Sequence, residues 1–373
     1  MTMTMMLNVD NLDKTNLTNL TNINNLTNQE NNFVDINENK NENMNEDFNE
    51  DINKDIKRPF FILNPVAGRA PRNRELHSLE SYFLVRLGNF DYIFTKDREE
   101  AIKTTRRLLK EGHKQIVSVG GDGTVNSVVN GFFENGKLVS KDAFLTIGLA
   151  GTGEDYFKSI KKFYGAGDWR ELVSDYQIVN VDVGKISFQN KEFSDQYFVN
   201  MASVAMIAKV VKERENLPTW LPSQVQYLWP TVKTIATYRS KKINLELDLI
   251  DDVTGERAEQ PLNADFNIKT MTISKGQFAG GGMQFAQNVT LDSGYFEVTL
   301  FLAMNPLKMC YNLGKLYRGT YSKVEGILKF KAKKVEIKSE DLIAVEFDGE
   351  VYGTTDLKME ILEKKLRIAV PKK

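Results

Sequence analysis

The chain has 373 residues, of which 41% are hydrophobic and 27% charged, and its formal net charge is −1. This length allows two domains, and the composition is that of an ordinary soluble protein. The single cysteine, Cys310, excludes an intrachain disulfide, and the only two histidines, His77 and His113, argue against a histidine metal site or a Ser-His-Asp triad. No apolar run approaches the roughly 20 residues of a membrane span and no secretory signal is apparent, so we expect a cytoplasmic protein.

Residues 1–57 differ in composition from the rest of the chain. The segment is rich in asparagine, as in NLTNLTNINN, and holds 4 Lys against 11 Asp and Glu, a charge of about −7 that leaves about +6 for the remainder. It cannot bury enough apolar surface to offset its chain entropy, so we predict a disordered tail. The mildly basic remainder suits nucleotide phosphates or an anionic membrane surface, although scattered solvated lysines explain it equally well.

Residues 58–177 alternate short apolar runs with segments of helical spacing. The clearest helix is predicted over residues 97–112, where Gly112 ends it. Strands are predicted at residues 60–64, 91–95, 116–119 and 145–149. Strands and helices that alternate at this cadence predict a Rossmann-like α/β domain with a parallel sheet.

From Ile178 to the end of the chain, apolar residues recur mainly at every second position. Short strands of this kind, separated by turns, predict an antiparallel β-sandwich over residues 178–373. One exception is residues 205–238, which have a helical pattern. An aromatic and aliphatic cluster in that segment could form a lipid-facing lip, but packing on the sheet is the favoured interpretation for Trp220, Leu221, Tyr227, Leu228 and Trp229.

The segment VSVGGDGTVNSVVNG places a glycine-rich turn between a predicted strand and a predicted helix. Ligands of open α/β sheets bind at the carboxyl ends of strands, where glycines allow close approach of a phosphate. Thr124 is predicted to be the helix N-cap, so that backbone N–H groups would point at an anion. Asp122 would repel a phosphate unless a cation lay between them, which favours Mg²⁺ on a nucleotide. The alternative is a simple tight turn with a capping aspartate.

Two further turns follow predicted strands, at NPVAG (residues 64–68) and LAGTGED (residues 149–155). Three such turns at one edge of a sheet favour a nucleotide-binding crevice over three unrelated turns.

Taken together and in this order, the segments FILNPVAG, VSVGGDGTVNSVVNG, LAGTGEDYF, GQFAGGGMQFAQNVTLDSGYFEV and VEFDGE resemble the diacylglycerol kinase catalytic-domain family. Each motif is weak alone, but the ordered set spans about residues 58–373. The resemblance implies an α/β nucleotide domain, a C-terminal β-sandwich, and a cleft between them that holds ATP and the hydroxyl of a lipid.

The resemblance also implies roles for individual residues. Glu350 of the FDGE segment matches the expected general base, and Asp122 and Asp155 match acidic residues near the ATP phosphates and magnesium. The predicted nucleotide-binding positions are Asn64, Thr95, Gly120, Gly121, Gly123, Thr124 and Thr152. Read without the resemblance, the Asp-Gly pair before Glu350 predicts only a hairpin turn.

LDSGYF (residues 291–296) matches a structural magnesium loop of the family, which implies Asp292 as a ligand with Thr290 and Tyr295 as backbone-oxygen ligands. The family commonly has two acids before this glycine, whereas the second position here is Ser293. Other departures are Ser127 in place of a glutamate, which should weaken a capping box by about 0.5–1 kcal/mol, and Glu154 in place of an asparagine.

The function implied is an ATP- and Mg²⁺-dependent lipid kinase acting on a diacylglycerol-like or sphingoid lipid at the membrane surface, in phospholipid biosynthesis. We expect peripheral membrane association and no nucleic-acid partner, and a homodimer is compatible with the sequence. Two alternatives stay open, namely a kinase of the NAD kinase type and a catalytically impaired protein that binds lipid or nucleotide. Ser127, Glu154 and Ser293 favour the impaired protein, whereas the retained Asp122 and Glu350 oppose it.

Overall fold

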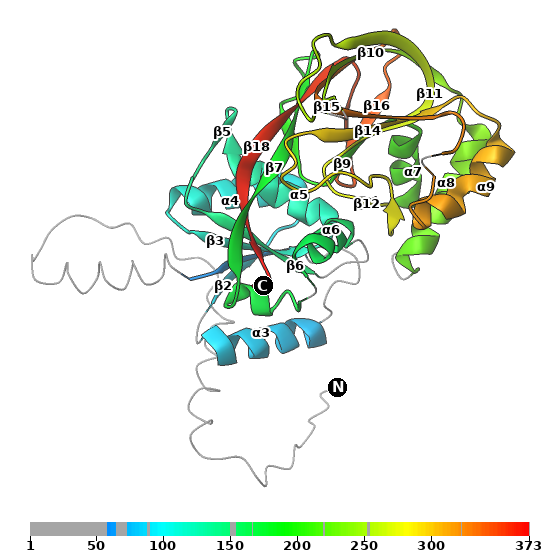
Figure 1. The fold of residues 1–373 in the computed structure, drawn as a ribbon. Helices are drawn as coiled ribbons and strands as arrows, with labels where there is room; N and C mark the ends of the chain where they lie inside the picture. Colours follow the sequence, from blue (N-terminus) through cyan, green and yellow to red (C-terminus); the bar gives the residue numbers. More distant parts are fainter. Residues whose placement is uncertain are drawn as a thin grey trace, which may run out of the picture. The chain divides into compact units, whose positions relative to one another are not determined.

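The computed structural model describes residues 58–64, 73–87, 90–149, 154–165, 167–218, 221–251, 254–321 and 323–372. The predicted disordered tail, Thr152 and Trp220 lie outside these ranges. Figure 1 shows the described chain as an α/β part, with α3 to α6 around the first strands, and a second part rich in long strands. The two-domain α/β plus β-rich architecture predicted from the sequence is therefore confirmed.

The first part contains a parallel sheet whose strands adjoin in the order β6-β3-β1-β2. The strands are β1 (Phe60–Leu63), β2 (Asp91–Phe94), β3 (Gln115–Gly120) and β6 (Phe144–Leu149), all paired in parallel. Every residue of β3 is buried, as expected of a central parallel strand covered on both faces. The pairs Leu63↔Val119 and Gly120↔Leu149 place the carboxyl ends of β1, β3 and β6 side by side.

The helices of this part are α3 (Asn73–Leu87), α4 (Arg98–Lys110), α5 (Asp122–Gly131) and α6 (Asp155–Tyr164). The side chain of Asp97 caps α4 by accepting a hydrogen bond from the backbone N–H of Glu100. Ala101, Leu108 and Leu109 bury one face of α4, as its spacing predicts. A short hairpin is formed by β4 (Phe133–Glu134) and β5 (Lys137–Leu138). A 3₁₀ turn at Glu171–Val173 completes this part.

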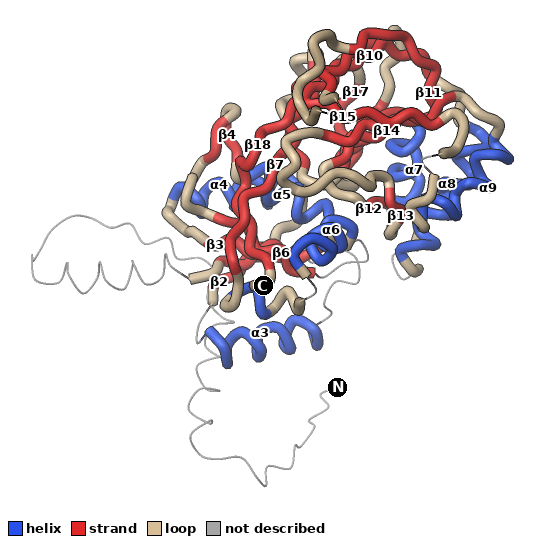
Figure 2. Tube along the Cα trace, in the orientation of Figure 1, coloured by secondary structure: helices blue, strands red, loops and turns tan. Residues whose placement is uncertain are grey.

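The second part is built from antiparallel strands, in agreement with the period-two pattern. Figure 2 shows how strands dominate this part, with its helices gathered at one end. The three helices are α7 (Met206–Arg214), α8 (Ser223–Thr237) and α9 (Pro306–Tyr317). The strands are β7 (Gln177–Phe188), β8 (Gln196–Phe198), β9 (Met201–Ala205), β10 (Lys241–Leu249), β11 (Leu262–Ser274), β12 (Phe278–Ala279), β13 (Met283–Gln284), β14 (Phe296–Leu302), β15 (Ile327–Lys338), β16 (Ala344–Phe347), β17 (Glu350–Thr354) and β18 (Leu357–Val370).

Two long strands, β7 and β18, connect the two parts. They pair with each other from Leu357↔Phe188 to Val370↔Gln177, and the end of β18 also pairs with β6 at Ile368↔Leu145. Leu366, Ile368 and Val370 therefore belong to the hydrophobic core of the α/β part, although the sequence pattern groups them with the sandwich. Because β18 pairs with β7 along its length and with β6 at its end, the sheet of the first part is continuous with these two strands.

Helix α9 was not predicted, although its start carries two ordinary signals. Asn305 accepts a hydrogen bond from the backbone N–H of Leu307, and Pro306 occupies the first turn. Among the helices of the described residues, none combines the length and apolar character that crossing a bilayer requires.

Candidate active site

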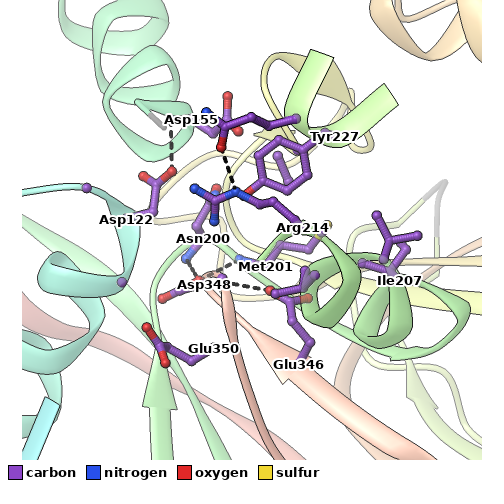
Figure 3. Close-up of a pocket in the computed structure, with 18 of the residues that line it drawn as sticks. Asp122, Asp155, Asn200, Met201, Ile207, Arg214, Tyr227, Glu346, Asp348 and Glu350 are labelled. Atoms are coloured by element: carbon purple, nitrogen blue, oxygen red, sulfur yellow. Dashed lines mark hydrogen bonds between the residues drawn. The ribbon is translucent and has the colours of Figure 1, made fainter. Parts of the chain in front are cut away.

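A cavity of about 390 Å³ lies where the strand ends of the α/β part meet α7, α8 and the β16–β17 hairpin. Figure 3 shows acidic side chains from both parts around it, among them Asp122, Asp348 and Glu350. One end of the cavity is lined by polar groups of the α/β part and the other by apolar side chains of the second part. The two ends therefore differ in chemistry.

The glycine-rich turn occupies the junction of β3 and α5. Helix α5 begins at Asp122 and Gly121 is its N-cap residue, so the prediction that Thr124 caps the helix is wrong. The Thr124 side chain instead packs against Gly120, where a Cβ atom would collide with it. Ser127 lies beyond the first turn and donates a hydrogen bond to the Gly123 carbonyl at 2.8 Å, so the expected capping-box relationship is absent here.

Asp122 lies at the start of α5 and its carboxylate faces α6. The carboxylate oxygens accept hydrogen bonds from the backbone N–H groups of Asp155 and Tyr156, both at 3.3 Å. Burial, followed by the negative charge of Asp155, raises the pKa of Asp122 to about 7. A cation beside this carboxylate would relieve that cost. Within the described ranges, however, no three His, Cys, Asp or Glu side chains are grouped so that the protein alone could hold a metal ion.

Four further predicted nucleotide positions, Asn64, Thr95, Gly121 and Gly123, line the same end of the cavity, whereas Gly120 does not reach it. Asn64 and Thr95 follow β1 and β2, and Thr95 is 1% exposed with its backbone N–H bonded to the Leu63 carbonyl. Gly121 faces open space, because a Cβ atom built there meets no atom within 4 Å. The strand ends therefore bring Asn64 and Thr95 beside the glycine-rich turn, whereas residues 65–68 and 150–153 of the other two predicted turns lie outside the described ranges.

Asp155 is only 2% exposed and is fully engaged with its neighbours. One carboxylate oxygen accepts from Lys158 Nζ at 2.7 Å and the other from the backbone N–H of Gly281 at 2.8 Å. Asp155 thus ties the start of α6 to the loop after β12.

Glu350, the first residue of β17, lies against the glycine-rich turn. A Cβ atom on Gly123 would be 2.5 Å from Glu350 Oε1, so any larger residue at this position would push the carboxylate aside. Burial raises the pKa of Glu350, and the nearby Arg98 guanidinium opposes that rise. Arg98 also donates to Asn126 Oδ1 at 3.1 Å and to Gln196 Oε1 at 2.7 Å, which fixes it beside the carboxylate.

The Asp348-Gly349 pair forms the β16–β17 hairpin turn, as its local pattern predicts, with φ values of 48° and 92°. Hydrogen bonds to the Asp348 side chain also hold the turn in place. The Asp348 carboxylate, 4% exposed, accepts hydrogen bonds from the backbone N–H groups of Val199, Asn200 and Met201 at 2.9 to 3.0 Å. Asn126 of α5 donates to the same carboxylate at 3.1 Å, which links the turn to the helix of the glycine-rich segment.

Glu346, two residues before Asp348, is a buried acid on the cavity wall. It accepts from Ser203 Oγ at 2.6 Å and from the backbone N–H of Gly349 at 2.7 Å. Burial raises the pKa of Glu346 to about 7. Its contact with Gly349 makes it a second support for the turn that carries Glu350.

The far end of the cavity is apolar. Tyr227 and Arg214 stand between the polar and apolar ends, with the guanidinium 4.9 Å from the centre of the Tyr227 ring. Beyond them the wall consists of side chains from α7, α9 and the strands below, including Met206, Ile207, Val210, Met283, Phe301 and Leu313.

The residues predicted to bind a loop metal lie away from this cavity and do not form a free ligand set. The Asp292 side chain is exposed, and its carboxylate accepts a hydrogen bond from Thr290 Oγ1 at 3.1 Å. The backbone carbonyls of Thr290 and Tyr295 accept hydrogen bonds from Lys275 Nζ instead. The arrangement does not fit the expected metal site.

Several residues that shape the site carry no sequence signal that would have revealed them. Arg98 and Glu346 occupy ordinary helix and strand patterns, and only the folded chain places them at these contacts. Asn126 lies inside the quoted glycine-rich segment, but its bond to Asp348 joins segments that are distant in sequence.

Two protein-family models match consecutive regions of the chain. The first is described as the diacylglycerol kinase catalytic domain and matches residues 58–186. The second is described as the YegS C-terminal NAD kinase beta sandwich-like domain and matches residues 202–370.

Individual proteins resemble the chain over most of its length. A Staphylococcus carnosus (strain TM300) protein named diacylglycerol kinase is 22% identical, covering 85% of this chain and 96% of its own. The Bacillus subtilis (strain 168) protein named "Putative lipid kinase YtlR" is 25% identical, covering 83% and 98%. A solved structure of a "putative diacylglycerol kinase" from Bacillus anthracis str. Sterne covers 84% and 95% with a TM-score of 0.64, and at 20% identity it supports the fold.

Proposed function

The chain belongs to the diacylglycerol kinase catalytic-domain family and is a lipid kinase, and from this premise we propose that it transfers the γ-phosphoryl group of ATP to a hydroxyl of a diacylglycerol-like or sphingoid lipid. The observation that carries the proposal is a cavity with a polar end at the glycine-rich turn, an apolar end in the second part, and Glu350 against the turn. Phosphoryl transfer demands mainly positioning and charge neutralisation, which this arrangement can supply.

The polar end suits a nucleotide triphosphate. No side chain caps the start of α5, and its first backbone N–H groups lie at the positive end of the helix dipole, which favours phosphate. Open space in front of Gly121 gives the phosphates room to approach. Asn64, Thr95, Gly120, Thr124 and, outside the described residues, Thr152 are the further positions that we assign to nucleotide binding.

Mg²⁺ fits beside Asp122 when a nucleotide is bound. The raised pKa of Asp122 reports a carboxylate that lacks a compensating positive charge, and Mg²⁺ is commonly bound by one or two carboxylates together with substrate phosphates. When bound, the ion would neutralise charge that develops on the transferring phosphoryl group. Asp155, already bonded to Lys158 and Gly281, would contribute by orienting the loop next to it.

Glu350 is the proposed general base. Its carboxylate lies in the cavity between the glycine-rich turn and the apolar end, so it can accept a proton from an alcohol that enters from the apolar side. A raised pKa makes a carboxylate a better proton acceptor, and the charge of the Arg98 guanidinium opposes this rise in the pKa of Glu350.

The apolar wall supports a lipid substrate over a soluble dinucleotide. Methionine, aliphatic and aromatic side chains gain free energy from covering an acyl or sphingoid chain, at about 25 cal/mol per Å² of apolar surface. The wall offers no such gain to the second nucleotide of NAD, which is why we prefer lipid as acceptor.

An exposed apolar stripe supports docking at a membrane surface. Val225, Leu228, Trp229 and Val232 follow the spacing i, i+3, i+4, i+7 on the outer side of α8, and Trp229 is 65% exposed. The preference for packing Trp229 on the sheet is therefore wrong. Gln226, Tyr227 and Thr231 on the same helix line the cavity, so a helix that contacts lipid headgroups would also border the substrate site.

The direct test is phosphorylation of defined lipids by the purified protein. ATP labelled at the γ-phosphate is incubated with vesicles that contain diacylglycerol, a sphingoid base, or neither, and labelled lipid is identified. We expect a labelled phospholipid in one of the first two. In Glu350→Gln the rate should fall by about 10²- to 10⁴-fold while ATP still binds, because the amide cannot accept the proton.

Glu325→Gln is the matched control, since Glu325 lies on the surface with its side chain 89% exposed. Equal turnover by wild type and Glu350→Gln would refute the assigned base. Phosphorylation of NAD without any labelled lipid would refute the lipid acceptor, and ATP binding without transfer to either would favour an impaired binding protein.

A further inference from the structure

A lysine ammonium group occupies the centre of the loop that resembles a magnesium-binding segment. The side chain of Lys275, which follows β11, and that of Asp182 on β7 are both 0% exposed. Lys275 Nζ donates to Asp182 Oδ2 at 2.7 Å, to the Thr290 carbonyl and Ser293 Oγ at 3.0 Å each, and to the Tyr295 carbonyl at 3.3 Å. We call these four oxygens the Lys275 cage.

The cage is also tied to the strands that join the two parts of the chain. Asp182 accepts from the backbone N–H of Gly294 at 2.8 Å and, through its other oxygen, from that of Lys364 at 2.8 Å. The Asp182 N–H donates to the Leu291 carbonyl at 2.7 Å. The cage therefore holds β7, β18 and the 290–295 loop together around one buried cation.

The charges and distances suit an ammonium rather than a divalent metal. The cage contains one carboxylate, two carbonyls and one hydroxyl, so a single positive charge balances it. Its distances of 2.7 to 3.3 Å are those of hydrogen bonds, whereas Mg²⁺ binds oxygen at about 2.0–2.1 Å. Asp292, the acid of the 290–295 loop itself, is exposed and bonded to Thr290 Oγ1.

We propose that the Lys275 ammonium takes the place of a bound divalent cation in this loop, so that the loop folds without metal. Ser293, which stands where an acid is common, is then a change that accompanies Lys275. Its hydroxyl accepts a hydrogen bond from Lys275, whereas a carboxylate at this position would give the cage one negative charge in excess. The requirement for Mg²⁺ is confined to the nucleotide end of the cavity.

The first test measures the melting temperature and bound metal of the full chain without nucleotide. Samples in EDTA are compared with samples in excess Mg²⁺, Mn²⁺ or Ca²⁺, and metal content is measured after purification without chelator. We expect no bound metal and the same melting temperature in all samples. A metal-dependent rise that disappears in Asp292→Asn would overturn the proposal. A rise that survives Asp292→Asn but disappears in Asp122→Asn arises at the nucleotide end and supports it.

The second test removes the ammonium. Lys275→Met leaves the Asp182 carboxylate buried without its cation, so the melting temperature should fall by roughly 10 °C. Lys242→Met is the matched control, because the Lys242 side chain is 78% exposed and its loss should have little effect. A Lys275→Met protein as stable as wild type would contradict the proposal. If this variant does not fold, the metal measurements on the wild-type chain still decide.

Discussion

Glu350 Oε1 lies so close to Gly123 that a Cβ atom on that glycine would be 2.5 Å from it. The contact joins a turn near the end of the chain to the first turn of α5. It depends on Asp348, which is held by three backbone N–H groups and by Asn126 of the same helix. The proposed base and the proposed phosphate-binding turn therefore share one support.

Substitution Gly123→Ala should separate activity from stability. The new methyl group would displace the Glu350 carboxylate, and a displacement of about 1 Å at a reacting group can cost on the order of 10²-fold in rate. Because Gly123 lies within α5, alanine should leave the unfolding free energy unchanged or raise it by a few tenths of a kcal/mol. Steady-state kinetics and urea unfolding measure the two effects.

Gly314→Ala in α9 is the control for that experiment, since its Cβ atom would meet only the flexible end of Arg318 at 3.4 Å. Unchanged lipid phosphorylation by Gly123→Ala would show that the Glu350 position in this structure does not matter for turnover.

Removal of the Arg98 charge should move the pH dependence of activity. Burial raises the pKa of Glu350 and Arg98 lowers it, so Arg98→Met should raise that pKa further. A base must be deprotonated to act, so the acidic limb of kcat/KM should shift to higher pH, with a greater loss at pH 6 than at pH 8. Arg107→Met, at an exposed arginine on the same helix, should leave the profile in place. A uniform loss at all pH values would indicate that Arg98 is only structural.

Glu346 should make the protein less stable as pH rises. Its pKa is raised by burial from 4.5 to about 7, so the folded state retains a proton that the unfolded state releases. The stabilisation is complete below about pH 4.5, declines as pH rises to about 7, and is then absent. For a shift of this size it is on the order of 3 kcal/mol.

Urea unfolding of Glu346→Gln between pH 5 and pH 8 tests this prediction. The variant should lose that part of the pH dependence, whereas Asp122, whose pKa is also raised to about 7, should still contribute a slope. An unaltered slope in Glu346→Gln would mean that Glu346 does not carry a proton near neutral pH.

Substitution Trp229→Ala should weaken membrane binding without affecting the fold. The Trp229 side chain is 65% exposed, so its removal costs little packing, but a membrane-buried indole contributes through its apolar area. We expect roughly ten-fold weaker binding to anionic vesicles in sedimentation, with an unchanged melting temperature. The exposed Val85 on α3 provides the control, because Val85→Ala alters an apolar residue remote from the three helices. Equal loss in both variants would argue against a specific docking surface.

The sequence alone determined many of the strands, the clearest helix and the ordered set of motifs. Buried strands such as 115–120 and the amphipathic helix 98–110 follow from local periodicity, and the Asp-Gly hairpin follows from turn chemistry. Glycine-rich turns after parallel strands had to meet at one sheet edge, because parallel strands end on the same side. These features depend on neighbours in sequence or on a general rule of topology.

Only the tertiary structure decided which distant groups touch. It placed Glu350 on Gly123 and assigned the cap of α5 to Gly121 instead of Thr124. It also paired the end of β18 with β6 of the α/β part, and it placed the Lys275 ammonium within the 290–295 loop. Such contacts depend on strand register and side-chain burial summed over the whole chain, and a linear pattern does not encode the distance between residues far apart along it.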